Sequence, residues 1–189
     1  MVMRVFITVL VLIFSFQSWT KADDISDFQI EGISIGDSLL DYYTIKQIKE
    51  DDENIMNDGT YLTSSFQKNL KNYDKFQVVY KENDNRYIVV ALIGNIRFNN
   101  DIESCYRKQN LIIDEVSSLF KNLKKQEWGI LDLKMPASTN ATGTYNPVTY
   151  DFKNGDRIQI SCFDFSTKDS DRLKFMAYNH QYAIALQGN

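Results

Sequence analysis

The sequence predicts a single α+β domain: an antiparallel sheet built from hairpins, with a long amphipathic helix packed on one face. Alternating apolar and polar residues, which mark half-buried strands, form neighbouring pairs at 76–93 and 148–165. Between these pairs, about Asp101–Lys125 instead has apolar residues at helical spacing. Strands joined as hairpins, with helices set apart from them, are typical of α+β folds rather than of repeated βαβ units.

The first elements are short. Phe28–Ile35 alternates as a strand and shifts its phase at Gly32, where we expect a bulge. Gly36 ends this strand, and Asp37 is placed to cap a short helix that turns Leu39, Leu40 and Tyr43 inward. Thr44 and Gln47 have capping-box spacing, which predicts a second short helix from Thr44 to about Asp52.

The first hairpin pairs Phe76–Tyr80 with Tyr87–Ile93 around a polar loop, and Ile96–Phe98 prolongs its second strand. Asn100 then opens the longest helix, with Glu103 at the third helical position and an end near Lys125. One face of this helix is apolar: Ile102, Cys105, Tyr106, Ile112, Ile113, Val116, Leu119, Phe120 and Leu123. We therefore expect the helix to lie on the sheet.

The second half begins with a small, polar loop at 134–146. Val148–Phe152 and Arg157–Phe165 follow as strands, joined by a turn that contains Asn-Gly, a pair suited to positive φ. Leu173–Tyr178 is the last strand. The final residues favour a helical turn capped by Asn179 and ended by Gly188, with a continuing strand as the alternative.

The N-terminus has the anatomy of a secretory signal peptide. Arg4 precedes an uncharged apolar run from Val5 to Phe16, and Thr20-Lys21-Ala22 supplies small residues for a cut after Ala22. A membrane-spanning helix needs about 20 apolar residues, and this run is shorter. We expect residues 1–22 to be removed and 23–189 to form one exported domain, periplasmic or extracellular, with no transmembrane segment.

The charge of the chain excludes some partners. The net charge is −4, and removal of residues 1–22 takes away two of the 21 basic residues and none of the 25 acidic ones, which leaves −6. The sequence has no run of Lys and Arg that would mark a nucleic-acid or anionic-lipid surface. We therefore expect no nucleic-acid partner.

The two cysteines are predicted to form a disulfide. Exported chains enter an oxidising compartment, where an even cysteine count favours a bridge. Cys105 lies on the apolar face of the long helix, and Cys162 shares the inward side of its strand with Ile158 and Ile160. A Cys105–Cys162 bond would join the helix to the sheet.

Gly36-Asp37-Ser38-Leu39 resembles the nucleophile block of GDSL serine esterases and lipases, and this resemblance implies Ser38 as nucleophile with His180 as base. That family places Asp three residues before its His, but Ala177 stands there in this chain. A Gly-x-Asn-Asp block is also missing, since Phe98 stands where the Gly before Asn100 is needed. The family has a parallel sheet, which the hairpins contradict. We keep a GDSL-like ester hydrolase only as the alternative function and assign no catalytic residue.

A second resemblance involves the start of the domain. Ile-x-Gly-Ile-Ser-Ile-Gly-Asp-Ser, at 30–38, is similar to the opening of small α/β modules of the outer-membrane assembly lipoprotein type. It also resembles signal-bearing periplasmic proteins of marine bacteria whose function is uncharacterised. This likeness implies an envelope location and carries over no binding residue.

No metal or cofactor site is expected. Asp51 to Gly59 is acidic, but an EF-hand with Gly59 sixth would put Met56 third and Ser65 twelfth, and neither is a suitable ligand there. One His and two distant Cys do not make a zinc site. Asn140-Ala141-Thr142 matches a glycosylation acceptor.

The function most consistent with these observations is a non-enzymatic, exported, disulfide-stapled domain that binds a protein or a cell-envelope component. Aromatic residues are abundant, and Tyr145 and Tyr178 are candidates for exposed partner contacts.

Overall fold

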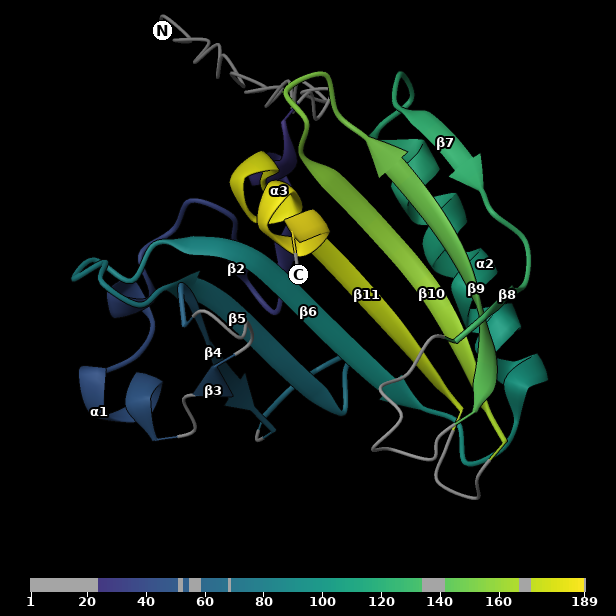
Figure 1. The fold of residues 1–189 in the computed structure, drawn as a ribbon, viewed down its shortest axis with the longest axis horizontal. Helices are drawn as coiled ribbons and strands as arrows, with labels where there is room; N and C mark the ends of the chain where they lie inside the picture. The colour runs from purple at the N-terminus through teal and green to yellow at the C-terminus, as the bar shows by residue number, and fades with distance from the viewer. Residues whose placement is uncertain are drawn as a thin grey trace, which may run out of the picture.

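A computed structural model describes residues 24–50, 53–54, 59–67, 69–133, 142–166 and 171–188. One large antiparallel sheet forms the body of the domain, with helix α2 (Ile102–Leu119) behind it and helix α3 (His180–Gly188) in front of it in the view of Figure 1. The α+β class and the antiparallel sheet are therefore as predicted.

The described part of the sheet has nine strands in the order β3-β4-β5-β6-β11-β10-β9-β7, with β8 also paired to β9, and all neighbours are antiparallel. Their bounds are β3 Glu53–Asn54, β4 Tyr61–Phe66, β5 Lys75–Lys81, β6 Val89–Arg97, β7 Lys124–Glu127, β8 Leu131–Asp132, β9 Gly143–Asp151, β10 Arg157–Phe165 and β11 Arg172–Tyr178. The two predicted hairpins, β5–β6 and β9–β10, are adjacent to β11, which joins them into one sheet.

Short elements precede this sheet. They are the 3-10 helices η1 Ile25–Asp27 and η2 Leu39–Asp41, the strands β1 Gln29–Ile30 and β2 Ile33–Ser34, and helix α1 Ile45–Lys49. The single strand expected over 28–35 is wrong, because β1 and β2 pair with each other. Glu31 and Gly32 both adopt positive φ, 52° and 85°, so Gly32 belongs to a two-residue hairpin turn and not to a bulge.

The structure confirms the predicted cap of α1 but not that of η2. Thr44 and Gln47 form the predicted capping box, although α1 ends earlier than expected, at Lys49. Ser38, and not Asp37, caps η2, with its hydroxyl accepting from the backbone N–H of Leu40. The Asp37 carboxylate instead accepts from the Ser34 N–H at 2.8 Å and from the Tyr42 hydroxyl at 2.6 Å.

Helix α2 is shorter than predicted at both ends. Asn99 and Asn100 adopt positive φ, so the helix starts after them, with Asp101 as its N-cap. It ends at Leu119 because Phe120 leaves the helical conformation and buries its ring in the core. Part of the segment expected to be helical, from Lys124 onward, forms strand β7 at the edge of the sheet.

The core lies mainly on the α2 side of the sheet. Buried residues of α2, including Ile112, Ile113 and Val116, cluster with inward residues of β5, β6, β9, β10 and β11. A smaller cluster lies on the other side, where Tyr182 of α3 packs near Tyr61, Met176 and Tyr178. The terminal helix and its Asn179 cap are as predicted: the Asn179 side chain accepts from the Tyr182 N–H at 3.0 Å.

The β9–β10 connection is a hairpin, as predicted, but its turn is longer than two residues. Gly155 adopts a φ of 89°, whereas Asn154 is not in the positive-φ region. The Phe152 N–H donates to the Asp156 carbonyl at 3.0 Å, and this bond closes a loop over 152–156.

Candidate functional site

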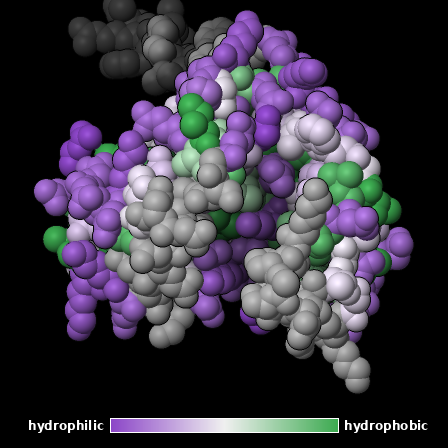
Figure 2. All heavy atoms as spheres, viewed as in Figure 1, coloured by the Kyte–Doolittle hydropathy of each residue, from purple (hydrophilic) through white to green (hydrophobic). Residues whose placement is uncertain are grey.

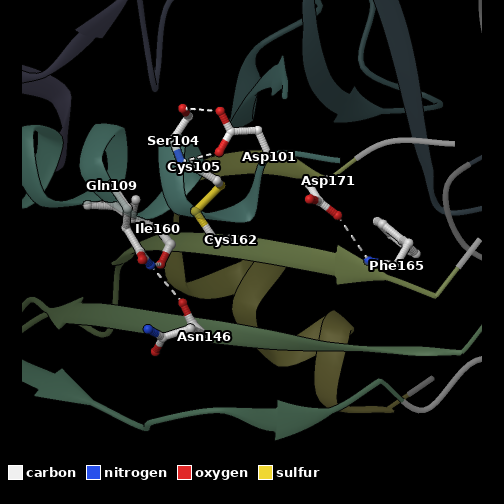
Figure 3. Close-up of a disulfide and its surroundings, with 9 residues drawn as sticks. All are labelled: Asp101, Ser104, Cys105, Gln109, Asn146, Ile160, Cys162, Phe165 and Asp171. Carbon is white, nitrogen blue, oxygen red and sulfur yellow. Dashed lines mark hydrogen bonds between the residues drawn. A yellow bond between two sulfur atoms is a disulfide. The ribbon is translucent and has the colours of Figure 1, made fainter. Parts of the chain in front are cut away.

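The two cysteines lie where the sequence predicted. Cys105 on α2 and Cys162 on β10 form a disulfide, with their Cα atoms 5.9 Å apart (Figure 3). One turn further along α2, the Gln109 amide donates to the carbonyls of Asn146, at 2.7 Å, and of Ile160, at 3.0 Å. Together these bonds fix α2 against β9 and β10. The disulfide is therefore part of the set of bonds that fixes α2 to the sheet.

Ser38 and His180 are not joined as a catalytic pair in the described structure. The Ser38 hydroxyl donates to the Arg86 carbonyl at 2.6 Å and accepts from the Leu40 N–H. Both partners are backbone groups, so this hydroxyl secures a helix cap to the loop before β6. His180 begins α3, where its backbone N–H donates to the Asp156 carboxylate at 2.8 Å. This geometry gives Ser38 a structural role.

Other motifs from the sequence fall partly outside the described residues. Asn140 lies there, as do Asp51, Asp52 and residues 55–58 of the acidic segment. Among the residues that are described, no group of three or more His, Cys, Asp or Glu side chains is arranged to hold a metal ion. Across the described ranges, no helix has the length and apolar character needed to cross a membrane.

The side of the sheet opposite α2 is covered by α3 over only part of its area. Side chains alternate between the two faces of a strand, so residues in register on one side form rows that run across the strands. Met176 and Tyr178 of β11 lie in the rows that contact α3. The two rows before them are not in that cluster. We call the outward side chains of these two rows, together with the neighbouring Phe165, the open face.

The first row of the open face changes from apolar to cationic across the sheet. Strand register aligns Leu131, Tyr145, Phe163, Arg172 and Arg97, on β8, β9, β10, β11 and β6 in that order. Arg172 and Arg97 are direct cross-strand neighbours, an arrangement of like charges that normally destabilises a sheet.

The second row repeats this pattern. Register aligns Pro147, Ser161, Lys174, Asn95 and Lys75, on β9, β10, β11, β6 and β5. The amide of Asn95 donates to Gln77 at 3.5 Å, and that of Gln77 donates to Ser65 at 3.4 Å. The polar side chains beside the cations therefore hydrogen-bond to one another.

Four cations meet on the open face: Lys75, Arg97, Arg172 and Lys174, which we call the cationic quartet. Within the described residues, the ion pairs are Arg86–Asp84, Lys125–Glu127 and Arg157–Asp151, and none includes a quartet member. Figure 2 looks onto this side, and between the segments drawn in grey it shows mainly hydrophilic side chains. The quartet thus gathers positive charge without an ion pair among the described residues, and the carboxylate recorded against it is that of Asp74, which accepts from the Arg97 backbone N–H at 2.7 Å.

Burial and repulsion both act on the quartet. Burial lowers the pKa of the Lys174 ammonium, and the neighbouring Arg172 lowers this pKa further. Burial likewise lowers the pKa of Arg172, with a second contribution from the charge of Arg97. A lysine that is half-buried beside another cation is held in an unfavourable environment, and an anion placed on the face would relieve it.

An aromatic stack adjoins the quartet. The rings of Tyr145 and Phe163 stack with centroids 5.5 Å apart, and those of Phe163 and Phe165 with centroids 6.1 Å apart. The Arg172 guanidinium lies 4.6 Å from the centroid of the Phe165 ring. This contact holds Arg172 in place and joins the aromatic stack to the quartet.

A shallow pocket lies beyond the stack, near β7 and β8. It encloses about 230 Å³ and is lined by Trp128, Leu131, Tyr145, Pro147, Thr149, Arg157 and Gln159. The Trp128 indole N–H donates to the Thr149 hydroxyl at 3.2 Å, and about half of the Trp128 side chain is exposed. We call this the Trp128 pocket. Figure 2 shows hydrophobic side chains on this side of the molecule, over the segment between β7 and β8.

Of the two aromatic candidates from the sequence, one lies on the open face. Tyr145 is half-buried in the aromatic stack, whereas Tyr178 is buried beneath α3 and is not accessible to a partner. Sequence patterns did not predict the quartet, because its members are spread from residue 75 to residue 174 on three strands. The one local signal was that Arg172 and Lys174 alternate with the inward residues Leu173 and Phe175.

Comparison with models of known families, with curated proteins and with solved structures finds no match to this chain. Function is therefore inferred from the residues of the open face.

Proposed function

We propose that this chain is an exported, non-enzymatic domain, stapled by its disulfide, that binds a protein or cell-envelope component through the open face. The observation that carries this proposal is the quartet: four cations gathered on one side of an acidic chain, without a described carboxylate to pair them. An intramolecular role would supply such cations with counter-charges, whereas a binding role leaves them for a partner.

The proposed location supports this reading. The leader at 1–22 and the resemblance of residues 30–38 to outer-membrane assembly modules both suggest the cell envelope. A disulfide between Cys105 and Cys162 is consistent with an oxidising compartment. A rigid sheet, fixed from behind by α2, is well suited to hold binding side chains in place.

The test compares two variants that lose the same charge. One replaces the quartet members Arg97, Arg172 and Lys174 with Gln. The matched control replaces Lys46, Lys49 and Lys121, which are exposed on α1 and after α2, with Gln. Both are purified as residues 23–189 and titrated, with the unmodified chain, against an envelope fraction of the source organism.

The expected result is saturable binding that the control retains and the open-face variant loses by at least tenfold. Thermal unfolding of all three proteins shows whether each is folded. Equal binding by the two variants, or no saturable binding by any of them, would overturn the proposal.

A further inference from the structure

The open face changes from cationic to apolar across the sheet, and this order limits what can bind to it. Its cations lie on β5, β6 and β11, its aromatic stack on β9 and β10, and the Trp128 pocket at the β7–β8 side. A uniform polyanion would match only the cationic part of this surface. A partner that is anionic at one end and apolar at the other matches all of it.

The aromatic stack favours side chains over sugar rings as the occupant. Phe163 stacks with both Tyr145 and Phe165, and Arg172 covers Phe165, so the faces of the two Phe rings are engaged within the chain, while Tyr145 has one stacking partner and also lines the Trp128 pocket. A sugar ring binds best to a free aromatic face. Stacked rings leave their edges, which carry the positive part of the ring quadrupole, for a ligand. These edges are compatible with both apolar and anionic groups.

The size of the face fits a short peptide segment. β5 and β9 are four strand spacings apart in the sheet, which corresponds to about 19 Å. An extended chain advances about 3.3 Å per residue, so about six residues cross from the quartet to the Trp128 pocket. The pocket, at about 230 Å³, then receives one large apolar side chain.

Polar side chains along this path suit a peptide backbone. Asn95 and Gln77 lie beside the quartet, and Gln159 lines the Trp128 pocket, where its amide donates to the hydroxyl of the buried Ser161 at 3.1 Å. The amides of Asn95, Gln77 and Gln159, which are partly exposed, both donate and accept, and can therefore bond to the N–H and C=O groups of an extended segment.

We propose that the open face binds an extended peptide segment of a partner protein, in which acidic residues over the cationic quartet are followed by an aromatic or aliphatic side chain in the Trp128 pocket. This inference rests on the proposed function and specifies the partner for the same surface. Arg97 and Arg172 contact the acidic residues as exposed forks suited to carboxylates, and Lys174 and Lys75 add point charges beside them.

The test uses three fluorescent octapeptides against residues 23–189. The first has four glutamates, one serine and then phenylalanine, leucine and phenylalanine. The second has glutamine in place of each glutamate, and the third has serine in place of each apolar residue. We expect the first to bind saturably, with affinity that falls as salt is raised, and the other two to bind at least tenfold more weakly.

Variants of the protein test which part of the open face binds each end of the peptide. The triple Gln variant at Arg97, Arg172 and Lys174 should bind the first peptide at least tenfold more weakly. The control variant at Lys46, Lys49 and Lys121 should bind it with unchanged affinity. Trp128→Ala should weaken binding of the first peptide several-fold and leave binding of the third, which lacks apolar residues, unchanged. Because Trp128 is half exposed, its replacement is expected to leave the fold intact.

Two results would overturn the inference. The first is equal affinity for the three peptides. The second is tighter binding of a sulfated polysaccharide or a single-stranded oligonucleotide than of the first peptide, by the same open-face residues. If envelope binding depends on the quartet but no peptide binds, the inference fails while the proposed function stands. If neither depends on the quartet, both fail.

Discussion

Lys174 illustrates how the proposed binding surface can hold a residue at the expense of stability. It lies between Asn95 and Ser161 on the open face, half-buried, with Arg172 two residues away on the same side of β11. Burial and the charge of Arg172 lower its pKa, so its charged form is less favourable in the folded chain than in the unfolded chain. Stability and the proposed binding role therefore oppose each other at this residue.

Replacement of Lys174 with Met should therefore stabilise the domain while weakening partner binding. The side chain becomes one heavy atom shorter and loses its charge, which removes the cost of desolvating the ammonium and its repulsion by Arg172. We expect the free energy of unfolding at pH 7 to rise by about 0.5–1 kcal/mol, measured by urea denaturation. The exposed control, Lys46→Met, should stay within about 0.5 kcal/mol of the unmodified protein.

The stability difference between this variant and the unmodified chain should also depend on pH. Because the pKa of Lys174 is lower in the folded state, its cost is fully present below the folded pKa and declines as pH rises toward the usual value of 10.5. The advantage of Lys174→Met should accordingly shrink between neutral and alkaline pH. A variant less stable than the unmodified chain at pH 7 would show that Lys174 has a stabilising partner.

At the scale of elements, the disulfide determines how α2 meets the sheet. Cys105 and Cys162 are 57 residues apart in the sequence, and the segment between them contains β7, β8 and β9. In the chain-entropy description, closing a loop of this length in the unfolded state stabilises the folded one by about 4 kcal/mol, before any native strain is subtracted.

Loss of this bond should strongly destabilise the domain. We expect reduction of the disulfide to lower the free energy of unfolding by about 2–4 kcal/mol, measured by urea denaturation with and without a reductant. The Cys105→Ala, Cys162→Ala double variant should lose at least as much and should not respond to the reductant. If reduction costs less than about 1 kcal/mol, the Gln109 bonds and the apolar contacts of α2 are sufficient to hold it.

Elements with a strong local signal were predictable from the sequence, and elements that depend on distant partners were not. The hairpins, the Thr44 capping box and the disulfide follow from alternation, cap spacing and the side on which each cysteine lies. Strand β7, with the sequence Lys-Lys-Gln-Glu, has no apolar alternation because it is an edge strand, and its pairing with β9 defines it. The quartet was not predictable, because only the strand order brings Lys75 and Lys174 together.

The molecule as a whole is acidic, but one face of its sheet is basic. The chain has a net charge of −4, yet the open face gathers four cations. In the proposed binding role, such an uneven distribution would orient an approaching acidic segment toward the open face and disfavour its approach elsewhere. The disulfide and α2 lie on the opposite side of the sheet, so the proposed binding surface and the stapled core are separated by the sheet itself.

Export of the chain is a prediction about the whole molecule. The first described element, η1, starts at Ile25, three residues after the expected cut, and its Ile25 side chain is buried in the main core. The fold therefore uses the chain almost from the expected mature terminus onward. A leader that is cleaved after Ala22 removes nothing that the described fold contains.

We expect the full chain, expressed in a Gram-negative host, to accumulate in the periplasm as residues 23–189 with the Cys105–Cys162 bond formed. Intact mass spectrometry of the osmotic-shock fraction should give the mass of this segment less two hydrogens, and alkylation without a reductant should add nothing. The same chain expressed in a host that lacks its periplasmic thiol oxidase provides the control, because both cysteines should then become accessible to alkylation. Retention of residues 1–22, or two alkylated cysteines in the normal host, would contradict export to an oxidising compartment.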